Sequence, residues 1–354
     1  MDSSQFAFLP RIGQGTDTAL TYTVHHVLSY LDSPGAVRML MLDYRKAFDS
    51  IPHQTILQSL IDKGAPKELL VWIISYLTCR KQRVKSNGSF SGWFEATSGV
   101  PQGGVLAPLL FAVAMDSLKV KCENSLIIKF ADDITVLHFL RHAKEDNLQI
   151  ELNNITKWSS EHGMQINFAK TKVINFVTKK CLAMGELRDL ASSTIIEEVQ
   201  SAKLLGVIFD CKLSWEQHLH YILSKAKRRI YYLHILRRIS PNNHQLIRAV
   251  YLTMIRPILS YAYSSWCNIS ASRFNQLVRF EKRLFRMFLF SCEQISQFCR
   301  RSAEQLAIKA KERQHPLNII YEAQDRRHSV RIGRPQRKLK SRTERFKNSF
   351  IQFA

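Results

Sequence analysis

The chain contains the stretch Leu126-Ile127-Ile128-Lys129-Phe130-Ala131-Asp132-Asp133-Ile134-Thr135-Val136-Leu137-His138-Phe139, in which two adjacent acids separate two apolar, β-branched runs. This pattern predicts a tight β-hairpin with Asp132 and Asp133 at its tip. Two neighbouring carboxylates repel each other, and a cation bound between them removes that repulsion. An exposed turn without a ligand explains the pair equally well, so the hypothesis of a cation site depends on a third acid.

Asp43 is the candidate for that third acid. It ends an apolar run of strand length that starts at Val37, and a segment with helical character follows it. If this strand lies beside the hairpin in one sheet, Asp43 and Asp132 meet at the same sheet edge. Mg²⁺ takes one or two carboxylates and leaves its other positions to water and substrate phosphates. Because a pair of such ions stabilises both oxygens of an in-line phosphoryl displacement, the predicted chemistry is nucleotidyl transfer.

Composition indicates a polyanionic partner. The chain has 354 residues, enough for about two domains or one elongated multi-lobed unit, and a formal net charge of +22. Such an excess of cations favours nucleic acid, because binding releases condensed counterions. The alternative is a basic soluble protein without such a partner.

Other bulk features limit the class of protein. The sequence has no apolar run of about 18 residues and no secretory signal, so we expect no membrane partner. The seven cysteines lack Cys-x-x-Cys spacing, which argues against a zinc knuckle and fits a reducing compartment. We therefore expect an intracellular protein, in the nucleus, the cytoplasm or both.

Three segments in order carry a family resemblance: Leu42-Asp43-Tyr44-Arg45-Lys46-Ala47-Phe48-Asp49, Ser98-Gly99-Val100-Pro101-Gln102-Gly103 and Phe130-Ala131-Asp132-Asp133. They resemble polymerase motifs A, B and C of reverse transcriptases, in the variant of non-LTR (LINE-type) retrotransposons of the jockey-like and chicken-repeat-like group. Each motif alone is weak, but three in this order are specific. The resemblance extends from Gln5 into the basic tail.

The resemblance implies an α+β fold in the shape of a right-hand polymerase, with a palm of antiparallel sheet covered by helices. Partial fingers would comprise residues 1–105, with the first palm strand inserted among them. The palm would comprise residues 106–212, including motifs C, D and E, and the helical thumb residues 213–300. Residues 301–354 would form a basic C-terminal extension.

The resemblance also assigns catalytic roles. Asp43, Asp132 and Asp133 would hold two Mg²⁺ ions, with Mn²⁺ as an alternative metal. Lys170 resembles the motif D lysine near the leaving pyrophosphate, where it would donate a proton or neutralise charge. Lys172 is the alternative candidate for that role.

Substrate contacts follow from the same resemblance. Phe48 would lie against the sugar of the incoming nucleotide and exclude a ribose 2′-hydroxyl, whereas a core aromatic is the structural alternative. Gln102 and Gly103 would approach the nucleotide or template base. The alternative is a loop that only caps a helix and binds no ligand. Leu9 stands where the family has an arginine that helps to hold the triphosphate, and Arg11 is the candidate substitute.

Residues 214–287 have a mostly helical pattern with breaks at Pro241 and Pro257 and a basic face typical of a thumb that follows a phosphate backbone. A solvated helix face is the alternative for any one of its nucleic-acid-binding candidates, which are Lys225, Lys227, Arg228 and Arg229.

The expected function is an RNA-directed DNA polymerase that acts in retrotransposition on an RNA template, a DNA primer and dNTPs. The alternative is a truncated, inactive remnant that only binds nucleic acid; the sequence leaves the oligomeric state open.

Overall fold

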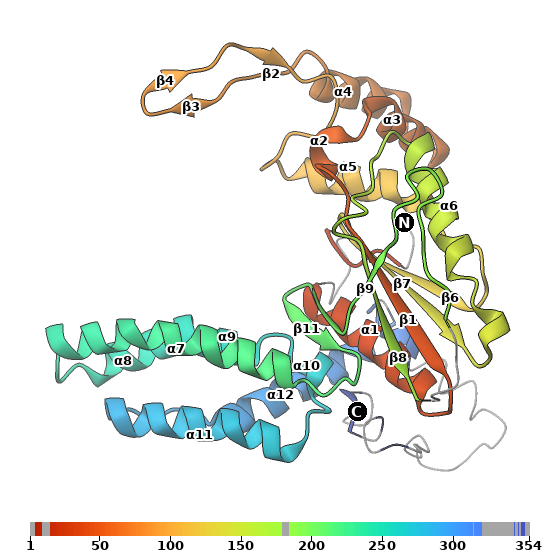
Figure 1. The fold of residues 1–354 in the computed structure, drawn as a ribbon. Helices are drawn as coiled ribbons and strands as arrows, with labels where there is room; N and C mark the ends of the chain where they lie inside the picture. Colours follow the sequence, from red (N-terminus) through yellow and green to blue (C-terminus); the bar gives the residue numbers. More distant parts are fainter. Residues whose placement is uncertain are drawn as a thin grey trace. The chain divides into compact units, whose positions relative to one another are not determined.

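The computed structural model describes residues 4–8, 15–178, 184–313, 315–320, 343, 346 and 348–350, without the side chain of Ala143. The chain divides into two compact units. The first comprises residues 1–10, 37–175 and 181–199, and the second comprises residues 11–36, 176–180 and 200–354. Both contain helices and strands, so the predicted mixture of α and β elements is confirmed (Figure 1).

The first unit is organised around a five-stranded sheet in the order β6-β7-β1-β8-β9 (Figure 1). Strands β6 and β7 pair antiparallel with Phe130 opposite Asp133, which leaves Ala131 and Asp132 as a two-residue turn. Strand β1 lies next to β7, so the expectation that the strand before Asp43 and the acidic hairpin share one sheet is confirmed. The strands are β1 (Ala36–Leu42), β6 (Ser125–Phe130), β7 (Asp133–Leu140), β8 (Lys172–Val177) and β9 (Glu197–Glu198).

The helices of the first unit share one hydrophobic core with this sheet. Alternate strand residues such as Leu40 and Leu42, or Ile134 and Val136, point to the same face and pack with Leu110 of α5 and other helix residues. The helices of this unit are α2 (Ala47–Ser50), α3 (His53–Asp62), α4 (Lys67–Leu77), α5 (Leu106–Ala114) and α6 (Leu148–Glu161), with 3₁₀ turns at Met115–Ser117 and Ala143–Glu145.

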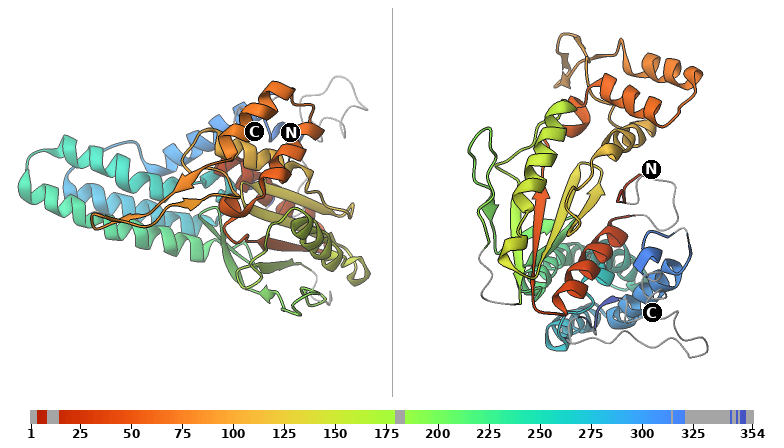
Figure 2. Two further views of the ribbon diagram at one scale, coloured as in Figure 1. Left: turned by 90° about the horizontal axis from the view of Figure 1, so that it is seen from above. Right: turned by 90° about the vertical axis from the view of Figure 1, so that its right-hand side faces the viewer.

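A narrow two-stranded ribbon projects from the end of α4 (Figures 1 and 2). Asn87 and Gly88 at its tip have φ angles of 48° and 82°, the combination that a type I′ hairpin turn requires. Asn87 and Gly88 therefore close a β-hairpin. Its strands pair as β2 (Lys81–Gln82) with β5 (Phe94–Glu95) and β3 (Lys85–Ser86) with β4 (Ser89–Phe90).

The second unit is mostly helical, with one hairpin between β10 and β11. Pro241 lies in the break between α7 and α8, as expected, whereas Pro257 lies in the first turn of α9, where its missing N–H costs nothing. None of the helices in the described residues is long and apolar enough to cross a membrane. The elements are α1 (Thr16–Leu31), β10 (Ser201–Leu204), β11 (Val207–Asp210), α7 (Glu216–Ile239), α8 (His244–Val250), a π-helical turn (Tyr251–Ile255), α9 (Arg256–Ser260), α10 (Tyr263–Trp266), α11 (Ala271–Phe288) and α12 (Ile295–Ala310).

A buried histidine makes the second unit sensitive to acid. His218 is fully buried, burial lowers its pKa to about 4, and its Nδ1 accepts a hydrogen bond from the Ile208 N–H at 3.3 Å. The unfolded chain therefore binds more protons below pH 6.5, so stability falls as pH decreases through 6.5 towards 4. For this histidine we expect a loss of about 2 kcal/mol at pH 5 relative to pH 7.5.

His218→Gln keeps an acceptor but cannot titrate, so it should reduce the loss of stability between pH 7.5 and pH 5 by about 2 kcal/mol, whatever its effect at pH 7.5, while the buried His25 and His26 keep their own contribution. Urea unfolding followed by tryptophan fluorescence measures the change, since the indole of Trp266 lies 5.3 Å from the His218 ring. Substitution of the exposed His244 by Gln is the matched control. Equal pH profiles for the His218 variant and the parent would contradict the prediction.

Candidate active site

Three carboxylates converge at one edge of the sheet. Asp43 follows the last residue of β1, Asp132 occupies the hairpin turn, and Asp133 begins β7. Although Asp133 as a residue is exposed, its carboxyl group is partly withdrawn from water. This desolvation, followed by the negative charges of Asp132 and Asp43, raises the pKa of Asp133 to about 6. Asp132 and Asp43 therefore lie close enough to Asp133 for their charges to act on its carboxyl group.

Lys170 lies beside this cluster. Its Nζ is 3.7 Å from Oδ2 of Asp43, and both side chains keep substantial exposure to solvent. Asn167, on the same loop, donates its backbone N–H to the Asp43 carbonyl oxygen at 2.7 Å, so the loop is fixed to the end of β1. The geometry thus brings Lys170, but not the alternative Lys172, to the predicted carboxylates; Lys172 pairs with Glu197 at 3.3 Å.

The hairpin turn has a strained backbone held by a buried glutamine. Ala131 has a φ of 55°, a left-handed conformation that is unfavourable for residues with a Cβ. Gln5 is 2% exposed, and its Oε1 accepts from the N–H of Ala7 at 3.1 Å and that of Ala131 at 3.4 Å. Backbone bonds from Lys129 N–H to Ser4 O (2.8 Å) and from Phe6 N–H to Lys129 O (2.9 Å) join this N-terminal segment to β6. Sequence reasoning missed Gln5, whose contact to the turn spans 126 positions.

We expect Gln5→Met, which keeps the volume and removes the acceptor, to slow nucleotide incorporation about threefold to tenfold, because one hydrogen bond contributes about 1 kcal/mol. The effect should fall on the maximal rate in a primer-extension assay, with template affinity unchanged, because Gln5 supports the turn from a buried position. The thermal midpoint of the variant identifies any general loss of folding. An unchanged rate in a folded variant would show that the turn holds its conformation without Gln5.

The Ser98–Gly103 loop is docked tightly on the segment that follows Asp43. Gly99 N–H donates to Ile51 O and Val100 N–H to Phe48 O, both at 2.8 Å. Gly99 has a φ of +75°, and a Cβ there would lie 2.6 Å from the backbone of Asp49. Only glycine permits this approach. Gly103 also has a positive φ, of +86°, but faces open space.

Asp49 positions Gln102. The side-chain amide of Gln102 donates to Oδ1 of Asp49 at 2.7 Å, and the Ser98 hydroxyl donates to Asp49 O at 2.9 Å. The structure thus connects the loop after β5 with the short helix α2. Sequence reasoning gave Asp49 no role, although its place at the end of the first motif was visible.

Phe48 packs at the border of the core of the first unit. Its ring stacks on Phe111 of α5, with centroids 4.5 Å apart, and it packs against the sheet core. The side chain is only partly buried, so a surface of the ring remains outside the core. A sugar contact for this ring stays a prediction.

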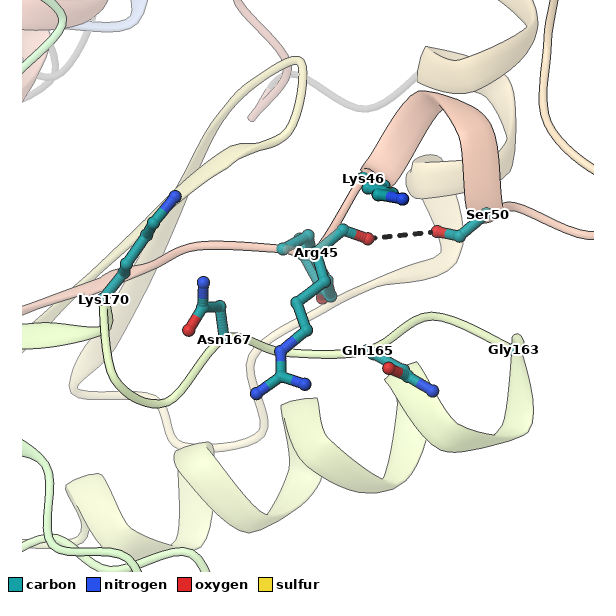
Figure 3. A pocket seen from close by; sticks show the side chains of 8 residues that line it. Arg45, Lys46, Ser50, Gly163, Gln165, Asn167 and Lys170 are labelled. Carbon is teal, nitrogen blue, oxygen red and sulfur yellow. Dashed lines mark hydrogen bonds between the residues drawn. The ribbon is translucent and has the colours of Figure 1, made fainter. Parts of the chain in front are cut away.

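A pocket of about 630 Å³ lies between the segment after Asp43 and the loop that carries Lys170 (Figure 3). Arg45 extends into it from one side and Lys170 stands at the other (Figure 3). The Arg45 backbone N–H is fixed by Gln165 O at 2.8 Å, and its carbonyl accepts from the Ser50 hydroxyl at 3.4 Å. With Lys46 also in the lining, the pocket presents three cations and can accept an anion.

The donor set at the sheet edge suits hard divalent cations. Among the residues that the structure describes, no group of three or more His, Cys, Asp or Glu side chains is arranged as a metal cage. A cage is not needed for Mg²⁺, which usually binds one or two carboxylates and completes its shell with water and phosphates. The raised pKa of Asp133 is the sign of a cluster that a cation would stabilise.

The four predicted phosphate contacts, Lys225, Lys227, Arg228 and Arg229, are all exposed along α7 of the second unit. The Lys225 Nζ lies 5.0 Å from the Tyr221 ring centroid, and the Arg229 guanidinium lies 5.9 Å from that of Tyr232. Arg11, the predicted triphosphate contact, lies outside the described residues. Most of the predicted basic extension at 301–354 does so too, from residue 321 to 342 without a gap.

A family model described as reverse transcriptase (RNA-dependent DNA polymerase) matches residues 4–209, more than half of the chain. The chain is 28% identical over 294 residues to a probable RNA-directed DNA polymerase from transposon BS of Drosophila melanogaster, covering 80% of this chain and 32% of that protein. It is 26% identical over 285 residues to the RNA-directed DNA polymerase from mobile element jockey of the same organism, covering 77% and 30%. The chain thus spans about a third of the length of these curated relatives.

A solved structure of telomerase from Candida tropicalis, in complex with a fragment of telomeric RNA, aligns with a TM-score of 0.44 and 13% identity. The alignment covers 90% of this chain and 53% of that chain.

Proposed function

Since the chain belongs to the reverse transcriptase family, in the non-LTR (LINE-type) retrotransposon group, we propose that it extends a DNA primer on an RNA template during retrotransposition. The observation that carries the proposal is the convergence of Asp43, Asp132 and Asp133 on one sheet edge, where the charges of Asp43 and Asp132 act on Asp133. A nucleotidyl transfer site needs carboxylates at such a place, open to solvent and to phosphates.

In this proposal Asp43 and Asp132 hold divalent ions, and Asp133 contributes negative charge beside them. Two Mg²⁺ ions, or Mn²⁺ in their place, supply stabilisation of the attacking and leaving oxygens when bound. Lys170 stands next to Asp43 on the side of the cationic pocket, where its ammonium group neutralises charge that develops on the departing pyrophosphate. Arg45 and Lys46 add positive charge to the same pocket.

The remaining assignments complete the substrate site. The exposed surface of the Phe48 ring selects deoxynucleotides by excluding a 2′-hydroxyl, and its stacking on Phe111 keeps the ring in place. Gln102, oriented by Asp49, contacts the nucleotide or the template base, and Gly103 leaves the backbone accessible beside it. Arg11 is proposed to grip the triphosphate.

We propose the division of a right-hand polymerase for the chain as a whole. Residues 1–105 act as partial fingers, 106–212 as the palm, 213–300 as the thumb and 301–354 as a basic extension. The exposed cations of α7 bind the phosphate backbone of the template-primer duplex, and they are Lys225, Lys227, Arg228 and Arg229.

Primer extension on an RNA template with dNTPs and Mg²⁺ tests the proposal directly. The expected result is full-length product whose formation needs the RNA strand, the primer 3′-hydroxyl and a divalent ion. Tight template binding without extension under Mg²⁺ or Mn²⁺ would refute the proposed activity and favour a remnant that only binds nucleic acid.

A further inference from the structure

The ribbon that leaves α4 carries an unusual surface of exposed rings and cations. Residues 80–96 contain four cations, Arg80, Lys81, Arg83 and Lys85, against one acid, Glu95. Three of its aromatic rings are more than half exposed: Phe90 (51%), Trp93 (60%) and Phe94 (64%). Large exposed rings are costly in water, so their concentration on a projecting arm points to a ligand.

The rings and cations alternate on one face of the ribbon. The Arg83 guanidinium lies 3.9 Å from the ring centroid of Phe90 and 4.5 Å from that of Trp93, and the Lys85 Nζ lies 5.3 Å from that of Phe90. Arg83 and Lys85 lie on the same side of the ribbon because both contact the Phe90 ring, and Phe90 pairs across from Lys85. Arg83, Lys85, Phe90 and Trp93 therefore form one composite surface, which we call the stacking face.

The chemistry of the stacking face matches an unpaired nucleic-acid strand. Aromatic rings and guanidinium planes stack on bases, and cations between them neutralise the phosphates that connect those bases. A protein partner with an apolar helix would bury the rings but would leave Arg83 and Lys85 facing an apolar surface, which is unfavourable. A base-paired strand keeps its bases stacked on one another and offers the rings no free base face.

The base of the ribbon is tied to the Gln102 loop. The Arg80 guanidinium donates to Gly99 O at 2.9 Å and to Ser98 O at 3.3 Å, and Ala96 N–H donates to Arg80 O at 2.8 Å. The arm therefore starts at the loop that carries Gln102. On the proposed function, an RNA strand whose base meets Gln102 continues from there as unpaired template.

We propose that the stacking face binds the single-stranded RNA template ahead of the site of nucleotide addition. This inference rests on the proposed function for the identity of the strand, and on Arg83, Lys85, Phe90 and Trp93 for the contact. Phe90 and Trp93 stack on successive bases, and Arg83 and Lys85 contact the phosphates.

The test measures binding rather than catalysis. Fluorescence anisotropy of the full chain with a labelled single-stranded oligo-U RNA, in EDTA and without dNTPs, compares the parent with the double variant Phe90→Ala/Trp93→Ala. We expect the double variant to bind at least about tenfold more weakly. A blunt RNA–DNA hybrid of the same length should lose less than about twofold. The conservative pair Phe90→Tyr/Trp93→Phe should restore single-strand affinity because it keeps two rings.

Val84→Ala is the matched control, because Val84 is 68% exposed on the same ribbon but has no ring. Arg83→Gln/Lys85→Gln should reduce the slope of log affinity against log salt by about 1.4 on single-stranded RNA, corresponding to two phosphate contacts. The proposal would be overturned if the double-alanine variant bound single-stranded RNA as tightly as Val84→Ala does. It would also be overturned if the double-alanine variant lost as much affinity for the hybrid as for the single strand. If single-strand binding depends on the two rings but the chain extends no primer, the stacking face is supported and the proposed function is refuted.

Discussion

Asp132→Ala is expected to reduce primer extension by at least about 1000-fold, with template affinity changed by less than about twofold. The reason is electrostatic. Asp132 lies in the turn between β6 and β7, close enough to Asp133 to raise the pKa of that neighbour, and Asp43 acts on the same carboxyl group. Removing Asp132 takes away one of the two proposed metal-binding carboxylates at the sheet edge, and several kcal/mol of transition-state stabilisation go with it.

The measurement is single-turnover extension of a labelled primer on an RNA template, with binding followed separately in EDTA. Asp43→Ala should behave like Asp132→Ala, because both acids are proposed to hold the ions. Asp62→Ala removes an exposed acid on α3 that pairs only with Gln58 among the contacts found in the described residues, and it is the control for a general loss of charge. Extension that survives Asp132→Ala would refute the site even if the chain is a polymerase.

The sequence predicted the parts of this site that depend on local pattern. The alternation in 126–139, and the apolar run that ends at Asp43, specify a hairpin and a strand without reference to the rest of the chain. Their placement in one sheet followed from the requirement that the acids meet, and the strand order supports that requirement.

The contacts between residues far apart in the chain could not be predicted from the sequence. We expected the glycines of the Gln102 loop to let its backbone approach a ligand closely. At Gly99, however, the close approach is to the chain's own backbone at Asp49. Nothing local distinguishes these two partners. The contact from Gln5 to Ala131 and that from Gln102 to Asp49 join positions 126 and 53 residues apart, and each depends on how sheet and helices pack.

The same close approach makes Gly99→Ala the substitution with the largest expected effect on folding. The new Cβ would lie 2.6 Å from both the Cα and the carbonyl oxygen of Asp49, and backbone atoms cannot move aside as a flexible side chain could. The φ of +75° adds strain of about 1 kcal/mol for any residue with a Cβ. With the displacement of packed backbone we expect a total loss of roughly 3 kcal/mol in the free energy of unfolding.

Gly64→Ala separates the two contributions. Gly64 lies just after α3 and has a φ of +73°, almost that of Gly99, but a Cβ there meets no atom within 4 Å. In urea unfolding it should lose only the conformational part, about 1 kcal/mol. Gly99→Ala should also slow primer extension at least about tenfold in the fraction that remains folded, because moving the loop shifts Gln102 away from Asp49. Equal unfolding free energies for the two variants would show that the loop yields at Gly99, and that its docking on Asp49 does not hold Gln102 in position.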